Sequence, residues 1–222
     1  MINAVLFDLD GTLIDTNELI VQSFKYTFKK HLNIDISKDE IVKFFGEPLH
    51  TTLARYDEKN ADRLLKDYRE YNESIHDSMI KGIEGAEEVL KELKNRGIKL
   101  GIVTSKRRTL AERGLNIFNL LGLMDVVITP EDTLKHKPEG EPAVKACKLL
   151  GVSPEEALMV GDSPVDILCG KNAGTKTCFV KYSAVPFKDV VYTNPDYVIV
   201  KLRDLLDIVE DSTSHRFDGA SA

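Results

Sequence analysis

Short apolar runs recur along the chain, and longer segments with helical periodicity separate them. The runs are rich in β-branched residues and are almost continuously apolar, without the alternation of a half-exposed strand. Such runs indicate strands that are covered on both faces, as in a parallel sheet. The predicted strands are 4–7, 100–103, 126–128, 157–160, 178–180 and 197–200.

The segments between the later runs predict helices. Residues 84–96 place Val89 and Leu93 on one face, and Gly97 is typical of a helix end. A second helix is expected over 141–150. Strands that alternate with helices in this way predict an α/β fold with a doubly wound parallel sheet.

One interval is too long for this alternation. About ninety residues separate the first two predicted strands, whereas a βαβ unit needs only about thirty. Helical patterns fill the surplus at 18–31, 38–45 and 60–76. We therefore predict an all-helical domain inserted into the sheet domain. The alternative is a set of extra helices packed directly on the sheet.

These patterns lead to a predicted domain organisation. The α/β core comprises residues 1–14 and 82–210, and the helical insertion comprises residues 15–81. The last segment, 211–222, is polar and rich in small residues, so we expect a disordered tail outside the fold.

Composition narrows the function classes. Among 222 residues, Lys and Arg number 30 and Asp and Glu number 36, which gives a formal net charge of -6. This acidic balance disfavours a dedicated binder of nucleic acid or anionic membranes. The three cysteines form no C-x-x-C pair, and we find neither a signal peptide nor a membrane-spanning run. We expect a cytoplasmic protein.

Polar residues of a particular kind follow the predicted strands. Ligands of open α/β sheets bind at the carboxyl ends of the strands, so these residues are the candidates for a site. They are Asp8 and Asp10 after the first strand, Thr104 and Ser105 after the second, Lys137 after the third, and Asp162 and Asp166 after the fourth. One lysine cannot neutralise four carboxylates, and hard oxygen ligands favour Mg²⁺ as the missing cation.

This residue set suits phosphoryl transfer. Asp8 could attack phosphorus and form an aspartyl-phosphate, and Asp10 could serve as the acid and base. Thr104, Ser105 and Lys137 suit phosphoryl binding. Asp162 suits the metal, with Asp166 as a supporting ligand. Taken singly, each residue has an ordinary structural alternative: Thr104 can end a strand, and Asp166 can cap a helix.

Four segments carry a family resemblance. FDLDGTL, GIVTSK, HKPEGEP and VGDSPVD resemble, in this order, the four motifs of the haloacid dehalogenase superfamily of phosphatases. The insertion point resembles the branch with a helical cap. The resemblance implies that Asp8 is the nucleophile and Asp10 the acid/base. It also implies that Asp8, the backbone carbonyl of Asp10 and Asp162 hold Mg²⁺. Dehalogenases lack an acid at the place of Asp10, so dehalogenation is not expected.

A closer resemblance extends into the predicted cap. Residues 16–20, 67–72 and 170–177 are similar to bacterial Mg²⁺-dependent inorganic pyrophosphatases of this superfamily. This similarity implies that pyrophosphate, a small phosphorylated substrate, is the first candidate. A phosphatase for phosphoglycolate or a sugar phosphate, or a phosphosugar mutase, is the alternative. A non-catalytic phospho-acceptor switch is a remote third possibility, because such domains lack the large insertion.

Specificity is expected to come from the insertion. Residues 44–48 are interpreted as a cap loop that faces the site, and Gly46 permits a tight bend there. An ordinary interhelical turn is the alternative. The second phosphoryl group of pyrophosphate needs cationic partners, for which the candidates are His50, Arg55, Arg69, Lys106 and Arg107. Of these, Lys106 and Arg107 are nearest in sequence to the predicted site.

Overall fold

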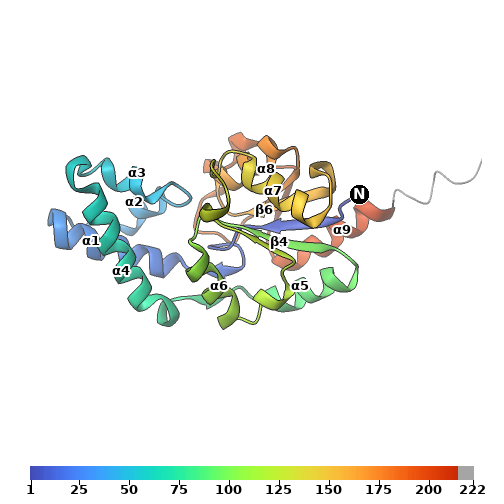
Figure 1. The fold of residues 1–222 in the computed structure, drawn as a ribbon, viewed down its shortest axis with the longest axis horizontal. Coiled ribbons are helices and arrows are strands. Elements are labelled where there is room, and N and C mark those ends of the chain that lie inside the picture. Colours follow the sequence, from blue (N-terminus) through green and yellow to red (C-terminus); the bar gives the residue numbers. More distant parts are fainter. Residues whose placement is uncertain (215–222) are drawn as a thin grey trace, which may run out of the picture.

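A parallel six-stranded sheet forms the centre of the larger part of the molecule (Figure 1). The computed structural model describes residues 1–214. The strands are β1 (Ala4–Phe7), β4 (Lys99–Val103), β5 (Val126–Ile128), β6 (Ala157–Gly161), β7 (Lys176–Val180) and β8 (Tyr197–Ile199). Their order is β5-β4-β1-β6-β7-β8, and every neighbouring pair is parallel. All six predicted strands are therefore confirmed to within a few residues.

Helices cover both faces of this sheet. The helices α5 (Ala86–Asn95), α6 (Arg108–Ile117) and α9 (Leu205–Ser214) lie on one face, and α7 (Glu141–Leu150) and α8 (Pro164–Ala173) lie on the other (Figure 1). Alternate residues of β1 point to opposite sides, as a strand requires: Val5 and Phe7 join the first core, and Ala4 and Leu6 join the second. The doubly wound α/β fold is confirmed.

The insertion consists of four helices beyond a short antiparallel ribbon. The ribbon pairs β2 (Ile14–Asp15) with β3 (Lys81–Gly82). Between these strands lie α1 (Asn17–Leu32), α2 (Lys38–Val42), α3 (Leu49–Ala54) and α4 (Ala61–Met79). They share a core of their own, which includes Phe24, Phe28, Ile41, Leu53 and Leu64. Figure 1 shows this helical group beside the sheet domain rather than on a face of the sheet. The separate core supports the predicted division into core and cap, which stays a prediction.

Two sequence-based boundaries differ from the structure. The helix expected over 38–45 ends at Val42, because residues 43–45 form turns with i→i+3 hydrogen bonds before the bend at Gly46, where φ is +82°. The tail expected from residue 211 begins within a helix, because α9 continues to Ser214 and the hydroxyl of Ser212 accepts a hydrogen bond from the Ile2 amide at 3.1 Å. The rest of that predicted tail lies outside the described residues. Within residues 1–214, no helix has the length and apolar character to cross a bilayer.

Replacing Phe28 by Ala tests the importance of the cap core. The ring is fully buried and makes edge contacts with Phe24 and Tyr56. We expect F28A to lower the free energy of unfolding by about 3–5 kcal/mol in urea titrations, because it leaves a cavity. The exposed Leu149 on α7 provides the control, and L149A should change stability by less than about 1 kcal/mol. An F28A effect as small as the control effect would contradict the packing described.

Candidate active site

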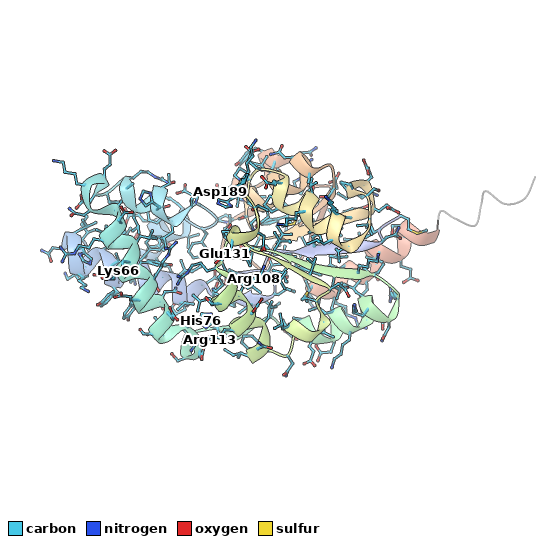
Figure 2. All side chains as sticks on the ribbon, viewed as in Figure 1. Lys66, His76, Arg108, Arg113, Glu131 and Asp189 are labelled. Carbon is cyan, nitrogen blue, oxygen red and sulfur yellow. The ribbon has the colours of Figure 1, made fainter. Side chains whose placement is uncertain are left out.

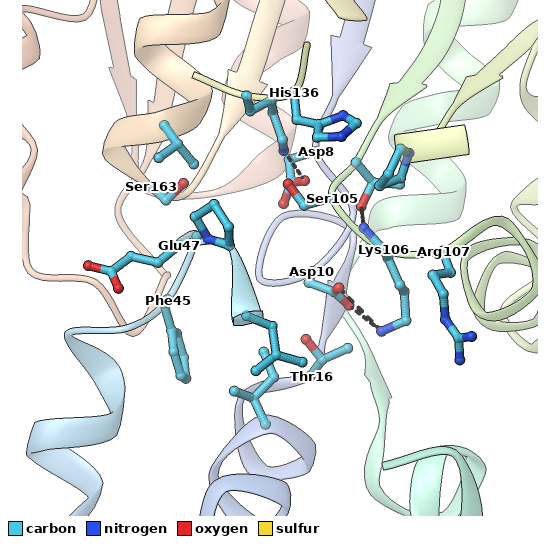
Figure 3. A pocket seen from close by; sticks show the side chains of 18 of the residues that line it. Asp8, Asp10, Thr16, Phe45, Glu47, Ser105, Lys106, Arg107, His136 and Ser163 are labelled. Atoms are coloured by element: carbon cyan, nitrogen blue, oxygen red, sulfur yellow. Dashed lines mark hydrogen bonds and ion pairs between the residues drawn. The ribbon is translucent and has the colours of Figure 1, made fainter. Parts of the chain in front are cut away.

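A cleft of about 520 Å³ separates the cap from the carboxyl ends of the central strands. Figure 3 shows side chains from both parts converging on it. The core side supplies all seven strand-end candidates, which are Asp8, Asp10, Thr104, Ser105, Lys137, Asp162 and Asp166. Of the other predicted contacts, five also line the cleft: Gly46, His50, Arg69, Lys106 and Arg107. The fold therefore brings the predicted site residues to one place.

Three buried carboxylates form the floor of the cleft. Asp8, Asp162 and Asp166 each offer an oxygen, and these oxygens lie within 4.8 Å of one another. The ammonium of Lys137 donates to Oδ1 of Asp8 and to Oδ1 of Asp166, both at 2.6 Å. Its third hydrogen bond goes to the carbonyl of Val103 at 3.1 Å. One buried ammonium thus faces three buried carboxylates, and the cluster carries excess negative charge when all are ionised.

Burial and mutual repulsion shift the pKa values of this cluster. Burial, with Asp166 and Asp10 nearby, raises the pKa of Asp8 to about 7, although Lys137 opposes the shift. Burial also raises the pKa of Asp162 well above its usual range, and the charges of Asp166 and Asp8 add to this effect. Burial alone would lower the pKa of Lys137, but the carboxylates of Asp166 and Asp8 outweigh it and raise this pKa. A further cation would therefore stabilise the ionised form of these carboxylates.

The carboxylate oxygens are not equally available to a metal. Oδ2 of Asp162 accepts a hydrogen bond from the Ser183 hydroxyl at 2.8 Å, and no donor among the described residues reaches its Oδ1. Oδ2 of Asp8 is likewise without a donor from this part of the chain. In contrast, Oδ2 of Asp166 accepts from the amide and hydroxyl of Ser163, at 3.1 and 2.5 Å. The donor set fits a hard divalent cation held by Asp8 and Asp162, with Asp166 in support.

The structure shows Asp166 in the capping role that was the alternative to a metal ligand. Ser163 and Asp166 form a capping box at the start of α8, while the other oxygen of Asp166 receives Lys137. One side chain therefore fixes both the helix start and the lysine.

Gly11 allows the loop after β1 to approach Asp162. Its φ is +80°, and a Cβ atom there would lie only 2.1 Å from Oδ2 of Asp162. A side chain at this position is thus excluded both by backbone conformation and by space. The glycine of the Asp-x-Asp-Gly sequence is required for the carboxylates of β1 and β6 to meet.

Asp10 lies outside the buried cluster. Its carboxylate pairs with the Lys106 ammonium, at 2.9 and 3.2 Å, on the open side of the cleft (Figure 3). Thr104 is buried at the end of β4, and its hydroxyl accepts a hydrogen bond from the Lys106 amide at 3.1 Å. Ser105 is exposed next to it. The two acids that follow β1 therefore lie in different environments. Asp8 is buried, whereas Asp10 is open to solvent.

The cap loop touches the core. A Cβ atom on Gly46 would lie 3.0 Å from the hydroxyl of Ser163 and 3.0 Å from a methyl group of Val165. Residues 44–48 connect α2 to α3 and line the cleft, so this segment is an interhelical turn that also faces the site. Arg55 does not line the cleft, and its guanidinium pairs with Glu47.

The sequence interpretation missed several residues of the site. Ser183 holds Asp162, and Tyr68 and Asn72 of α4 line the cap side of the cleft. Ser163 was identifiable, since it stands three residues before Asp166 as a capping box requires. Ser183 gives no such signal, because it follows β7 and approaches Asp162 only through the pairing of β7 with β6.

Comparisons with known proteins agree with this geometry. Residues 5–180 match the family model described as haloacid dehalogenase-like hydrolase. The chain is 51% identical over 214 residues to the "Putative pyrophosphatase PpaX" of Clostridium perfringens strain 13, covering 96% of this chain and 100% of that protein. It is 43% identical over 210 residues to the pyrophosphatase PpaX of Bacillus cereus strain AH820, covering 95% of this chain and 97% of that protein.

A solved structure supports the same assignment. The crystal structure of a "predicted phosphatase" from Clostridium acetobutylicum superposes with a TM-score of 0.85 at 27% identity. The match covers 95% of this chain and 99% of that one. The strand-end carboxylates, the buried lysine and the family match agree: the chain belongs to the haloacid dehalogenase-like hydrolases and is an enzyme of their phosphatase type.

Proposed function

We propose that this enzyme is a Mg²⁺-dependent inorganic pyrophosphatase that acts through an aspartyl-phosphate on Asp8. The proposal rests mainly on the hydrogen-bond partners of the Asp8 carboxylate. Lys137 holds one oxygen of its carboxylate at 2.6 Å, and no donor within residues 1–214 reaches the other oxygen at the floor of the cleft. A fixed carboxylate with a free oxygen suits a nucleophile.

The reaction has two steps in this proposal. The free oxygen of Asp8 attacks phosphorus, the bond from phosphorus to the leaving oxygen breaks, and Asp10 gives its proton to the leaving group. Asp10 then takes a proton from water, which attacks the same phosphorus and breaks its bond to Asp8. Inorganic phosphate leaves, and Asp8 is a carboxylate again.

The division of the two acids supports these roles. Asp8 is buried against Lys137, whereas Asp10 faces the open part of the cleft, where water and a leaving group can reach it. Lys137, with Thr104 and Ser105, would hold the phosphoryl oxygens during both steps. Mg²⁺ held by Asp8, Asp162 and the backbone carbonyl of Asp10, with Asp166 in support, would supply charge stabilisation for those oxygens.

Pyrophosphate is the proposed substrate because both relatives described above carry the name of a pyrophosphatase over nearly the whole chain, cap included. The cap forms one wall of the cleft, so similarity there bears on substrate choice. A phosphatase for phosphoglycolate or a sugar phosphate, or a phosphosugar mutase, would use the same core chemistry. The choice therefore depends on a direct comparison of substrates.

A phosphate-release screen makes that comparison. We expect kcat/KM for pyrophosphate to exceed the values for phosphoglycolate, glucose 1-phosphate and nucleoside monophosphates by at least about tenfold with Mg²⁺ present. A higher kcat/KM for phosphoglycolate than for pyrophosphate would refute pyrophosphate as the substrate. Slow phosphate release with conversion of one sugar phosphate into its isomer would indicate a mutase instead.

Exchanging the two acids for amides separates their roles. D8N should lower kcat by at least about a thousandfold, because an amide oxygen is a poor nucleophile. D10N should also impair turnover, but more for phenyl phosphate than for pyrophosphate, because phenolate needs the proton more. The exposed Asp39 on α2 provides the control, and D39N should retain activity. Near wild-type turnover by D8N would refute the proposed mechanism.

Stability should show how protons and metal compete for the acidic cluster. The pKa of Asp8 is raised from 3.8 to about 7. Between these values the folded protein holds more protons than the unfolded chain, so this group lowers the free energy of unfolding as the pH rises. The same protons occupy oxygens that Mg²⁺ needs. We therefore expect Mg²⁺ to raise the melting temperature more at about pH 8 than at about pH 5.

The control for this measurement is D162N, which removes one proposed ligand. Its melting temperature should respond little to Mg²⁺ at either pH. An equal response of the wild-type protein at both pH values would contradict the assignment of the metal to the buried carboxylates.

A further inference from the structure

The five cations that could meet a second phosphoryl group are not equally available. Arg55 pairs with Glu47, and the His50 ring lies 3.3 Å from the carboxylate of Asp62 on the protein surface. Lys106 is occupied by Asp10, as described above. The two remaining cations are Arg69 and Arg107, and both line the cleft.

Arg69 and Arg107 face the cleft from different parts of the molecule. Arg69 belongs to α4 of the cap, and Arg107 precedes α6 of the core. The Arg107 guanidinium reaches to within 3.9 Å of the Glu73 carboxylate. Glu73 lies four residues after Arg69 on α4, so these two side chains are neighbours on the helix surface. Arg107 therefore reaches the turn of α4 that follows Arg69.

Neither arginine of this pair has a close carboxylate partner. Arg69 has no ion pair within 4.0 Å among the described residues, and the contact of Arg107 with Glu73 is at the limit of an ion pair. Partial burial and the charge of Arg107 lower the pKa of Arg69, with Glu131 opposing the shift. Two guanidinium groups thus lie near each other at the edge of the cleft, and of the two nearby carboxylates, Glu73 only just reaches Arg107 and Glu131 forms no ion pair with Arg69. An anion between them would relieve their repulsion.

The pair also lies on the appropriate side of the reacting centre. Figure 3 shows Asp10 between Asp8 and the end of the Lys106 side chain, with Arg107 on the far side of Lys106. In the proposed mechanism, Asp10 gives its proton to the leaving group, so the leaving group occupies this side. Planar guanidinium groups suit phosphate oxygens, because each can donate two parallel hydrogen bonds.

We infer that Arg69 and Arg107 bind the second phosphoryl group of the substrate, the one that leaves, and that this pair selects a diphosphate over monoesters with uncharged leaving groups. The inference rests on the proposed function for its substrate. It assigns specificity to a contact between cap and core, so the subsite is complete only when α4 and α6 lie together.

Substitutions that remove the charge of one arginine test the pair. R69Q and R107Q should each lower kcat/KM for pyrophosphate by about tenfold to a hundredfold, because each removes charge-assisted hydrogen bonds. Phenyl phosphate has no second phosphoryl group, so its kcat/KM should stay within about twofold of wild type. Equal losses for both substrates, or no loss for pyrophosphate, would overturn the inference.

A matched control comes from the same helix pair. Arg113 of α6 pairs with Asp77 of α4 at 2.7 Å, outside the cleft. Figure 2 shows Arg113 near His76 of α4. R113Q therefore removes an arginine between the same two helices without touching the subsite. It should leave the ratio of the two kcat/KM values unchanged. A change in that ratio as large as that of R69Q would overturn the inference.

Binding of methylenediphosphonate, a diphosphate that resists hydrolysis, distinguishes this inference from the proposed function. By calorimetry with Mg²⁺ present, R69Q and R107Q should bind it about tenfold or more weaker than wild type, while inorganic phosphate binding changes little. Equal binding of methylenediphosphonate by all three proteins would overturn the subsite. Arginine-dependent binding by a wild-type enzyme that does not hydrolyse pyrophosphate would refute the proposed substrate and support the subsite.

Discussion

The ammonium of Lys137 between Asp8 and Asp166 is the interaction on which the site depends. It is almost fully buried, so each charge there has lost water and must be matched by another. Removing the lysine would leave three buried carboxylates with no cation from the chain. The cluster is short of positive charge even with it, and this deficit makes a divalent cation the expected partner. The geometry of the sheet, the start of α8 and the close approach at Gly11 all serve to assemble these charges.

In the proposed function the cap is needed as well as the core, because Arg69 of the cap acts with Arg107 of the core on the second phosphoryl group. Asp8, Lys137 and Thr104 converge at one end of the cleft, whereas α4 and the segment before α6 supply the other end. Contact of the Gly46 turn with Ser163 closes one side of this space. In this proposal, chemistry and specificity come from different segments of the chain that meet only in the folded protein.

Much of this could be predicted from the sequence. The six strands could be predicted because each is covered on both faces and is therefore almost continuously apolar in sequence. The strand-end rule then placed Asp8, Lys137 and Asp162 at one edge, since parallel strands share a carboxyl end. Short cap elements such as α3 were not predicted, because their conformation depends on packing rather than on periodicity. The contact of Ser183 with Asp162 and the approach of Arg107 to α4 depend on tertiary structure, which local patterns do not encode.

The proposed mechanism requires a phosphoryl group to pass through Asp8. The direct measurement is acid quenching of D10N during reaction with pyrophosphate, followed by mass spectrometry of the peptide that contains Asp8. Without the base that activates water, the aspartyl-phosphate should accumulate. We therefore expect a single phosphoryl group on Asp8. The double variant D8N/D10N should remain unmodified. Pyrophosphate hydrolysis by D10N with no phosphorylated peptide at any time point would contradict the account.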